Sequence, residues 1–451
     1  MPIRWGMPSK YRPYQPEQSY LLPPSPRDWL PESHLALFVS DVVDELELSA
    51  FEAWNEESDP RGNQPFHPGM MLKILIYAYA TGTFSSRRIA KKIEEDVAFR
   101  VLAAGNFPQH RTICDFRKAY LKEFIGLFGQ VVQIAKGSGL IKLGRIAIDG
   151  TKVKANASRH KAMSYDRMKQ EEKRLEKEIA DLLKQAERAD RNEDEKYGSE
   201  NRGDELPEEL RRRESRLQKI REAKKRLEQR QADQDRERGR HEGDQGRPNA
   251  KKGKPFKREF GEPAEKAQDN FTDPESRIMK MGNGFEQSYN AQASVDETHQ
   301  IIVAVGVTNC AADNGQLIPM IEATTQTTGE APQQVLADAG YRSEENFERA
   351  EAMDIEAVIA LGREGKKDAA TISPTNKATR RMKEKLATAE GAAAYRRRKV
   401  IVEPVFGWIK RVLGFRQFSL RGLEKVHAEW HLVCLALNLR RMNTCSAGAF
   451  G

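Results

Sequence analysis

Residues 143–158 read LGRIAIDGTKVKANAS, and this stretch decides the fold class. The apolar run Ile146–Ile148 has the length and composition of a short buried strand, and we expect that strand to end on Asp149. A carboxylate at the end of a buried strand is held rigidly, and the glycine that follows it, Gly150, lets a ligand approach closely. The stretch therefore predicts a sheet that carries a polar site at its edge.

An alternation of strand and helix patterns resumes after residue 271. Together with the strand before Asp149, this order is typical of a mixed sheet flanked by helices, with one long excursion inserted after the first strand. The predicted fold class is therefore mixed α/β. We expect strands at 285–296, 300–309, 333–338 and 356–361 and helices at 315–329 and 343–353.

The N-terminal part has a different pattern. Residues 1–30 are rich in Pro and Tyr and are predicted to form an extended arm, and apolar residues then recur at helical spacing in several short segments. Short helices with basic residues at their starts are typical of helix-turn-helix DNA-binding domains. An all-helical domain without a role in DNA binding has the same pattern. We predict a helical domain at 31–138 and leave these two interpretations open.

The excursion after the first strand is highly charged. Leu175, Ile179 and Leu182 follow a four-three alternation, and a similar run continues from Leu210 to Leu227 after a turn-like stretch. This pattern predicts a helical hairpin, or coiled coil, at 161–235. Solvated charge of this kind is also found on helices that have no binding function.

The segment that follows the hairpin has little apolar content. Residues 236–270 contain Gly, Pro and basic residues throughout. We predict a basic flexible linker here, which is also suited to contacting phosphate groups.

The overall composition limits the class of protein. The 451 residues include 75 Lys and Arg and 67 Asp and Glu, a formal net charge of +8, which is a weak indication of a polyanionic partner. No apolar run approaches the roughly 20 residues that span a bilayer, and the N-terminus lacks the apolar core of a signal peptide. The four cysteines lie far apart and form no C-x-x-C pair, so no structural zinc site is expected. We expect a cytoplasmic protein with no membrane partner.

Two aspartates are candidate metal ligands. Asp149 and Asp338 both close apolar strand runs and precede small residues. On neighbouring strands, they would place hard oxygen ligands side by side, as Mg²⁺ requires. Aspartates at strand ends also commonly cap turns or the helices that follow, and this is the alternative interpretation of each one alone.

A third acid, Glu403, is flanked by apolar residues and surrounded by cations. Pro404 disfavours helix at Glu403 and suits a first helical position, so we expect Glu403 at a helix start or a kink. An acid surrounded by cations is suited to holding a metal and a phosphate together. The cations are Arg396, Arg397, Arg398, Lys399, Lys410, Arg411, Arg416 and Arg421.

Several ordered motifs resemble those of the DDE transposases of bacterial insertion sequences. The resemblance covers nearly the whole chain and implies a ribonuclease-H-like catalytic core in two parts, 139–160 and 271–445, behind the helical N-terminal domain. The motifs are DGTKVKANAS (149–158), GFEQSYNAQASVD (284–296), AADNGQLIPMIE (311–322), VLADAGYRSEEN (335–346) and VEPVFGWIKR (402–411).

The resemblance also assigns roles to residues. It implies that Asp149, Asp338 and Glu403 form the catalytic triad and bind two Mg²⁺ (or Mn²⁺) ions. It matches Tyr395, Lys399 and Lys410 to a tyrosine-basic-glutamate-lysine signature, although Lys399 stands where related families often have Arg, which alone can clamp phosphate with two parallel hydrogen bonds. The residues predicted to contact DNA are Tyr395, Arg398, Lys399, Lys410, Arg411, Arg416 and Arg421.

The function implied by the resemblance is DNA transposition. Water would hydrolyse a phosphodiester at each end of the element, and the freed 3′ hydroxyl would attack target DNA directly. The N-terminal helices would bind the terminal inverted repeats of double-stranded DNA, and joint processing of two ends implies a homodimer on DNA. Two alternatives remain open: a metal-dependent nuclease that cuts but does not join, and a DNA-binding protein derived from a transposase.

Overall fold

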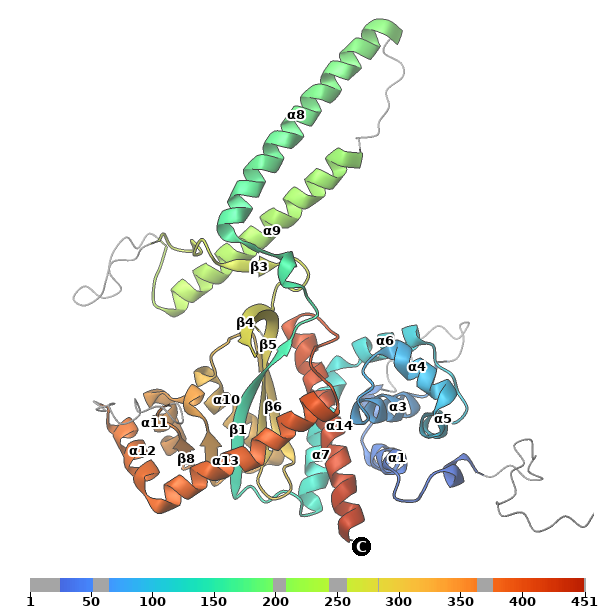
Figure 1. The fold of residues 1–451 in the computed structure, drawn as a ribbon, viewed down its shortest axis with the longest axis vertical. Helices are drawn as coiled ribbons and strands as arrows, with labels where there is room; N and C mark the ends of the chain where they lie inside the picture. The colour runs from blue at the N-terminus through green and yellow to red at the C-terminus, as the bar shows by residue number, and fades with distance from the viewer. Residues whose placement is uncertain are drawn as a thin grey trace, which may run out of the picture.

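The computed structural model describes residues 25–51, 65–197, 208–242, 258–282, 284–362 and 376–449. Figure 1 shows a sheet with helices packed around it, and one long helical hairpin that stands out from this body. Of the predicted N-terminal arm, residues 1–24 lie outside the described residues, and Pro26–Trp29 form a short 3₁₀ helix, η1.

The N-terminal region is helical, as the sequence predicts. Every residue of its central helix α3 except Lys73 is buried, and Pro68 occupies the first position, where the fixed φ of proline suits a helix. The chain turns after α3 at Gly82, which has φ +74°, and a Cβ there would lie 2.6 Å from the carbonyl oxygen of Leu413. The helices are α1 (Leu35–Glu45), α3 (Pro68–Ala80), α4 (Ser86–Glu95), α5 (Val97–Ala103), α6 (His110–Ala119) and α7 (Leu121–Gly137).

The sheet has β1 near its centre, in the order β4-β5-β1-β7-β8, with β6 also paired to β5. β5 runs antiparallel to β1, whereas β7 runs parallel to β1 and β8 runs parallel to β7. The predicted mixed α/β class is confirmed, and the arrangement is consistent with a ribonuclease-H-like core. The strands are β1 (Arg145–Lys154), β4 (Arg277–Met281), β5 (Gly284–Asp296), β6 (Ile302–Thr308), β7 (Gln334–Ala337) and β8 (Glu356–Ile359).

The first strand is longer than predicted. It does not end on Asp149 but continues to Lys154. The reason is its neighbour β5, which pairs with β1 up to Lys154↔Ser288 and so satisfies the backbone groups beyond the apolar run. The pairing with β7 stops at Ile148↔Ala337, so among the described residues this edge of β1 has no strand partner from Asp149 until Lys154 forms a parallel bridge with Gln417.

Helices α10 (Leu317–Thr328) and α13 (Ala389–Gly407) cover opposite faces of the sheet. Successive side chains of a strand point to opposite faces, and Asp149 lies opposite Ala293, the residue before Ser294. Thr324 of α10 hydrogen-bonds Ser294 at 2.9 Å, and Arg398 of α13 hydrogen-bonds Asp149 at 3.1 Å. The candidate metal ligand Asp149 therefore faces α13.

Helix α13 continues through Pro404, so the expectation that Glu403 lies at a helix start is wrong. Proline cannot donate the backbone hydrogen bond to the carbonyl four residues earlier. In this helix that carbonyl belongs to Val400, and the side-chain amide of Gln300 donates to it at 2.8 Å instead. A π-helical turn, η6 (Trp408–Val412), follows directly.

The C-terminal helix α14 (Leu423–Ala449) joins the N-terminal region to the sheet. It packs against α3 and α7 on one side and β6 on the other. A buried polar chain crosses the same boundary, because Arg117 donates to the Tyr79 hydroxyl at 3.0 Å and that hydroxyl donates to Glu429 at 3.3 Å. The N-terminal region and the sheet therefore share one continuous core.

The remaining helices next to the sheet are η3 (Asn314–Gln316), η4 (Ala339–Tyr341), α11 (Glu344–Ala352) and α12 (Lys377–Ala387).

The predicted helical hairpin is present between β1 and the rest of the sheet. Its helices pack through a small apolar cluster of their own, which includes Leu175, Leu217 and Leu227. Residues 198–207 between the two helices lie outside the described residues. The elements are η2 (Arg159–Lys161), β2 (Ala162–Ser164), α8 (Tyr165–Tyr197), α9 (Glu208–Glu237) and β3 (Gln268–Asn270).

The segment predicted as a flexible linker is in part ordered, so this prediction is wrong for residues 236–242, where α9 ends and Arg240 donates to the carbonyl of Arg258 at 2.6 Å, and for residues 258–270. Gly261 donates its N–H to Asp235 of α9 at 3.0 Å, and β3 pairs with β2. Residues 243–257 of the same prediction lie outside the described residues.

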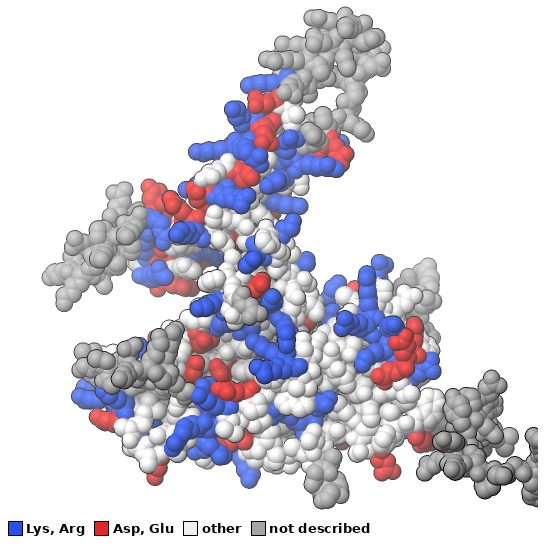
Figure 2. All heavy atoms as spheres, viewed as in Figure 1, with Lys and Arg blue, Asp and Glu red and all other residues white. Residues whose placement is uncertain are grey.

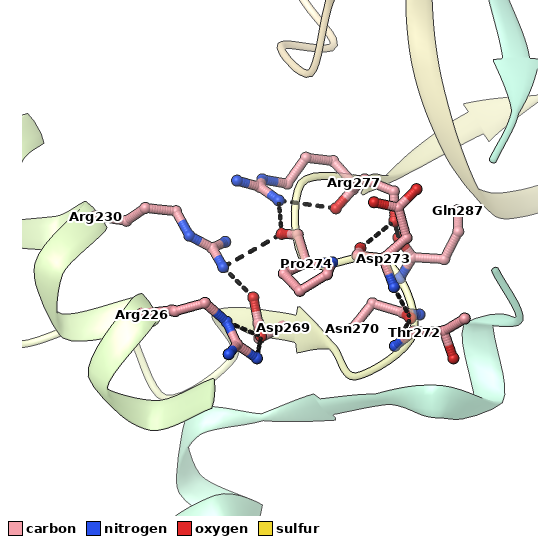
Figure 3. A network of polar contacts seen from close by, with 10 residues as sticks. Arg226, Arg230, Asp269, Asn270, Thr272, Asp273, Pro274, Arg277 and Gln287 are labelled. Atoms are coloured by element: carbon pink, nitrogen blue, oxygen red, sulfur yellow. Dashed lines mark hydrogen bonds and ion pairs between the residues drawn. The ribbon is translucent and has the colours of Figure 1, made fainter. Parts of the chain in front are cut away.

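A buried carboxylate fastens the base of the hairpin to this segment (Figure 3). Asp269 of β3 is fully buried and accepts hydrogen bonds from Arg226 and Arg230 of α9. Four residues on, Asp273 accepts from the Tyr289 hydroxyl at 2.8 Å and from the backbone of Gly422, both in the body of the protein. These contacts connect the hairpin to the sheet.

Candidate active site

The structure brings Asp149 and Asp338 together. The parallel pairing of β1 and β7 ends at Ile148↔Ala337, and the next residue of each chain segment is an aspartate, Asp149 within β1 and Asp338 directly after β7, so the two lie side by side. Burial raises the pKa of Asp149 to about 6; the charge of Arg398 lowers it and the charge of Asp338 raises it. A buried acid beside a second acid binds a cation favourably.

Each aspartate uses one carboxylate oxygen locally. Asp149 Oδ1 accepts from the N–H of Gly150 at 2.8 Å, and Asp338 Oδ1 accepts from the N–H of Gly340 at 2.7 Å. Asp338 is thereby the N-cap of η4. The capping role considered for it from the sequence is present, and it leaves Oδ2 of the same carboxylate for another partner.

Arg398 balances the charge of Asp149. Its Nη1 lies 3.1 Å from Asp149 Oδ2, and its side chain is only 8% exposed. Its Nε has no hydrogen-bond partner within the described part of the chain. Sequence analysis predicts a DNA contact for Arg398, but in this structure the guanidinium faces the carboxylate inside the protein, against the ring of Tyr395.

Glu403 is not brought to the two aspartates. It lies five residues after Arg398, which places it on another side of α13, and it is exposed. No hydrogen bond or ion pair connects it to any described residue. Across the described ranges, no three His, Cys, Asp or Glu side chains converge in a group that would hold a metal ion.

An acid that the sequence analysis did not select, Asp313, lies close to the pair. Its carboxylate accepts from Asn290 at 2.6 Å, from Gln292 at 2.9 Å and from Lys152 at 3.3 Å. Its charge raises the pKa of Asp149. Sequence analysis could have selected Asp313 from the motif AADNGQLIPMIE, where it lies shortly before a glycine and a predicted helix. Its hydrogen-bond donors, however, come from the distant strands β1 and β5.

Two glycines keep space free beside these acids and their hydrogen-bond partners. A Cβ on Gly340 would lie 2.8 Å from Asp338 Oδ1 and 3.3 Å from Asp313 Oδ2. A Cβ on Gly150 would lie 2.7 Å from Asp313 Oδ1 and 2.9 Å from Asn290 Oδ1. Side chains at these positions would therefore displace the acids or their partners.

Three of the predicted cations lie beside the C-terminal end of β1 or the residues directly after it. Lys410 donates to the Thr151 hydroxyl and, at 2.9 Å, to the carbonyl of Lys152, and burial lowers its pKa. Arg416 donates to the carbonyl of Lys410, and Arg421 donates to the carbonyl of Asn156. Lys399 and Arg411 are exposed on α13 and η6, and Tyr395 is half-buried.

Two of the three predicted metal ligands are arranged in a way that suits a hard divalent cation. Asp149 and Asp338 supply adjacent carboxylate oxygens, the ligand type that Mg²⁺ prefers, and the gap above Gly340 opens between two carboxylates. In the conformation described, Glu403 does not contribute to this set. The residues that fit a metal ion are therefore the two aspartates.

Comparisons with known families agree with the motifs. Residues 262–439 match the family described as Transposase DDE domain, and residues 24–119 match the family described as Transposase domain (DUF772). The first range contains Asp313, Asp338 and Glu403, and Asp149 lies between the two ranges. Neither a curated protein nor a solved structure matches the chain significantly.

Proposed function

The chain belongs to the DDE transposases of insertion sequences, and we propose on this premise that it binds the terminal inverted repeats of its element, cleaves the DNA at their 3′ ends and joins those ends to target DNA. The main observation in support is that Asp149 of β1 and Asp338, the residue directly after the parallel strand β7, lie side by side. DDE transposases act on DNA and depend on a divalent metal.

Asp149 and Asp338 would hold the metal, for which we propose Mg²⁺ or Mn²⁺, as two ions. Bound there, the metal supplies Lewis-acid polarisation of the scissile phosphate and lowers the pKa of the attacking oxygen. The aspartates are held ready for this by their own backbone contacts with Gly150 and Gly340.

Glu403 is the third acid of the proposal. It is exposed and makes no hydrogen bond or ion pair with the described residues, so its carboxylate is available to a ligand. It would reach the aspartates through a rearrangement of the C-terminal end of α13, and the adjoining π-helical turn η6 is of a kind frequently found at functional sites.

The reaction has two steps with the same bond changes. Water first attacks the terminal phosphodiester, and the bond to the 3′ oxygen of the element breaks, which leaves a 3′ hydroxyl and a 5′ phosphate. The 3′ hydroxyl then attacks a target phosphodiester, and the target's own 3′ oxygen leaves with the proton. One phosphodiester forms as one breaks in the joining step, so no ATP is required.

The remaining basic residues are suited to holding DNA. Lys410 places its ammonium against β1 two to three residues beyond Asp149, next to where a scissile phosphate would lie. The helical domain that we propose at 31–138 presents exposed Arg87, Arg88 and Lys91 on α4 and exposed Arg111 and Lys118 on α6. Short adjacent helices with such side chains are suited to reading the major groove.

The two ends of an element must be processed together, so we propose a homodimer on DNA, acting on the nucleoid in the cytoplasm. Within the described residues, no helix is long and apolar enough to cross a membrane.

The test uses labelled duplex DNA carrying the repeats that flank the gene, incubated with Mg²⁺ and the full chain. Wild type and Asp149→Ala are compared with and without a target plasmid. We expect metal-dependent 3′ nicks and joined products with wild type alone. Nicks without joined products would instead indicate a nuclease, and binding without cleavage by either protein would indicate a DNA-binding protein derived from a transposase.

A further inference from the structure

A basic groove lies at the base of the hairpin. It has a volume of about 530 Å³ and runs between the η2–β2 segment, the first turn of α8, the middle of α9 and Phe271. Its walls carry five basic side chains and no carboxylate. The basic residues are His160, Lys161, Arg167, Arg216 and Lys219.

Three of these cations have no partner within the described part of the chain. The side chains of Lys161, Arg167 and Lys219 are exposed and make no hydrogen bond or ion pair with any described residue. Arg216 lies 3.5 Å from Glu171, which is a weak contact for a charged pair. Like charges held together without counter-charges repel one another, so this arrangement favours an anionic ligand.

The rest of the hairpin differs from the groove. Along its length, cations of α9 pair with acids of α8, as in Arg213–Glu178 at 3.0 Å and Lys224–Glu172 at 2.9 Å. Exposed lysines without an ion pair to any described residue also occur elsewhere on α8, but the groove differs because several basic side chains line one hollow and no carboxylate is among its lining residues.

The hairpin offers little apolar surface for docking another helix. Its apolar residues are buried between α8 and α9 or against β3, and among its described residues Leu183 is the large apolar side chain that is strongly exposed. A protein partner held by apolar packing does not fit this surface. An extended polyanion does.

A line of basic residues connects the groove with the active site. The chain passes from Lys154 at the end of β1 to Lys161 in the groove, and Lys154 donates its backbone N–H to the carbonyl of Arg416. Arg421 donates to the carbonyl of Asn156 on the same stretch. In the view of Figure 2, Lys and Arg side chains lie over the hairpin and over the body below it, with acidic side chains among those of the hairpin.

We propose that this groove binds the sugar-phosphate backbone of duplex DNA that extends beyond the active site, so that the hairpin is a DNA-holding arm. The inference rests on the proposed function. The base of the hairpin is suited to this role because the Asp269 and Asp273 contacts hold it in place relative to the sheet (Figure 3).

The test compares two triple variants of the full chain that lose the same charge. The groove variant is Lys161→Ala/Arg167→Ala/Lys219→Ala, and the control is Lys173→Ala/Lys177→Ala/Lys184→Ala, which removes exposed lysines of α8 outside the groove. Binding to an inverted-repeat duplex with flanking DNA is measured by fluorescence anisotropy between 50 and 300 mM NaCl. Cleavage of the same DNA is measured in parallel.

We expect the groove variant to bind at least 10-fold more weakly at 150 mM NaCl, with the control within about 3-fold of wild type. The slope of log K against log salt should become shallower by about 2 to 3, because three phosphate contacts are lost. Equal binding by the two triple variants, with wild type cleaving normally, would overturn the inference alone. A wild type that neither binds nor cleaves the repeats would overturn the proposed function and this inference together.

Discussion

Arg398 Nη1 donates a hydrogen bond to Asp149 Oδ2 at 3.1 Å, and this contact joins helix α13 to the central strand β1. The pair is largely removed from water, with the guanidinium 8% and the carboxylate 20% exposed. Since Asp338 lies beside Asp149 and adds negative charge, the guanidinium compensates an acidic site from within the protein. A metal ion bound to Asp149 would share this carboxylate with Arg398.

The first prediction concerns this pair. Replacement of Arg398 by Gln leaves the Asp149 charge buried without its partner, which costs about 3 kcal/mol of unfolding free energy at pH 7. In an Asp149→Asn background the same replacement should cost much less, because no charge is left uncompensated. Urea unfolding of the single and double variants measures the difference. Arg397→Gln, which removes an exposed cation paired with Glu297, is the control, and equal losses in both backgrounds would refute the coupling.

The second prediction concerns Glu403. Its side chain is exposed and makes no hydrogen bond or ion pair with the described residues, so Glu403→Gln should change the unfolding free energy by less than about 0.5 kcal/mol. The Glu403→Gln variant should nevertheless cleave DNA about 100-fold more slowly or worse, because the proposed third metal ligand is lost. Glu390→Gln removes another exposed acid of α13 and should keep wild-type cleavage. Equal rates for the two variants would exclude Glu403 from catalysis.

The third prediction concerns Gly150. An alanine Cβ there would lie 2.7 Å from Asp313 and 2.9 Å from Asn290, so Gly150→Ala should lower the unfolding free energy by about 1 to 3 kcal/mol. Cleavage should fall as well, because the residues behind Asp149 must shift. Gly137→Ala meets no atom within 4 Å and is the matched control. Calorimetry measures the melting temperatures of both variants. Similar melting temperatures would contradict the prediction that a Cβ at position 150 is too close to its neighbours.

The sequence predicts the sheet well because the signals for it are local. The apolar run before Asp149 and the run before Asp338 each define a strand, and two parallel strands in register place the aspartates together. The resemblance to transposases adds the order of the motifs. Each of these features depends on residues that are close in the chain.

The features that the sequence analysis missed depend on distant partners. β1 extends to Lys154 because β5, more than 130 residues later, pairs with it. α13 passes through Pro404 because Gln300 satisfies the carbonyl of Val400. Asp313 joins the site because its hydrogen-bond donors come from β1 and β5. None of these partners is visible in a local pattern.

A fourth prediction concerns acid stability. His431 of α14 is buried against the ring of Phe128 of α7. This burial, with a smaller contribution from the charge of His427, lowers the pKa of His431 to about 3. The unfolded chain binds a proton at about pH 6.5 and the folded chain does not. This histidine therefore costs nothing above pH 6.5 and destabilises the fold progressively as the pH falls from 6.5 toward 3.

His431→Asn should remove that dependence, because an amide at this position can still donate to the carbonyl of His427, the present partner of His431. The loss of unfolding free energy between pH 7 and pH 5 should shrink by about 2 kcal/mol. Urea unfolding at the two pH values measures it, with the exposed His110→Asn as control. An unchanged acid dependence in the His431 variant would count against the role of burial.

The central claim is that Asp149 and Asp338 bind the catalytic metal, and exchange of each for cysteine tests it most directly. Mg²⁺ takes hard oxygen ligands, whereas a thiolate prefers softer ions. Cleavage of inverted-repeat DNA by Asp149→Cys and by Asp338→Cys is measured in Mg²⁺ and then in Mn²⁺ or Zn²⁺. We expect both variants to be inactive in Mg²⁺ and to recover activity with the softer metals. Cleavage at the wild-type rate in Mg²⁺ by either variant would contradict the claim.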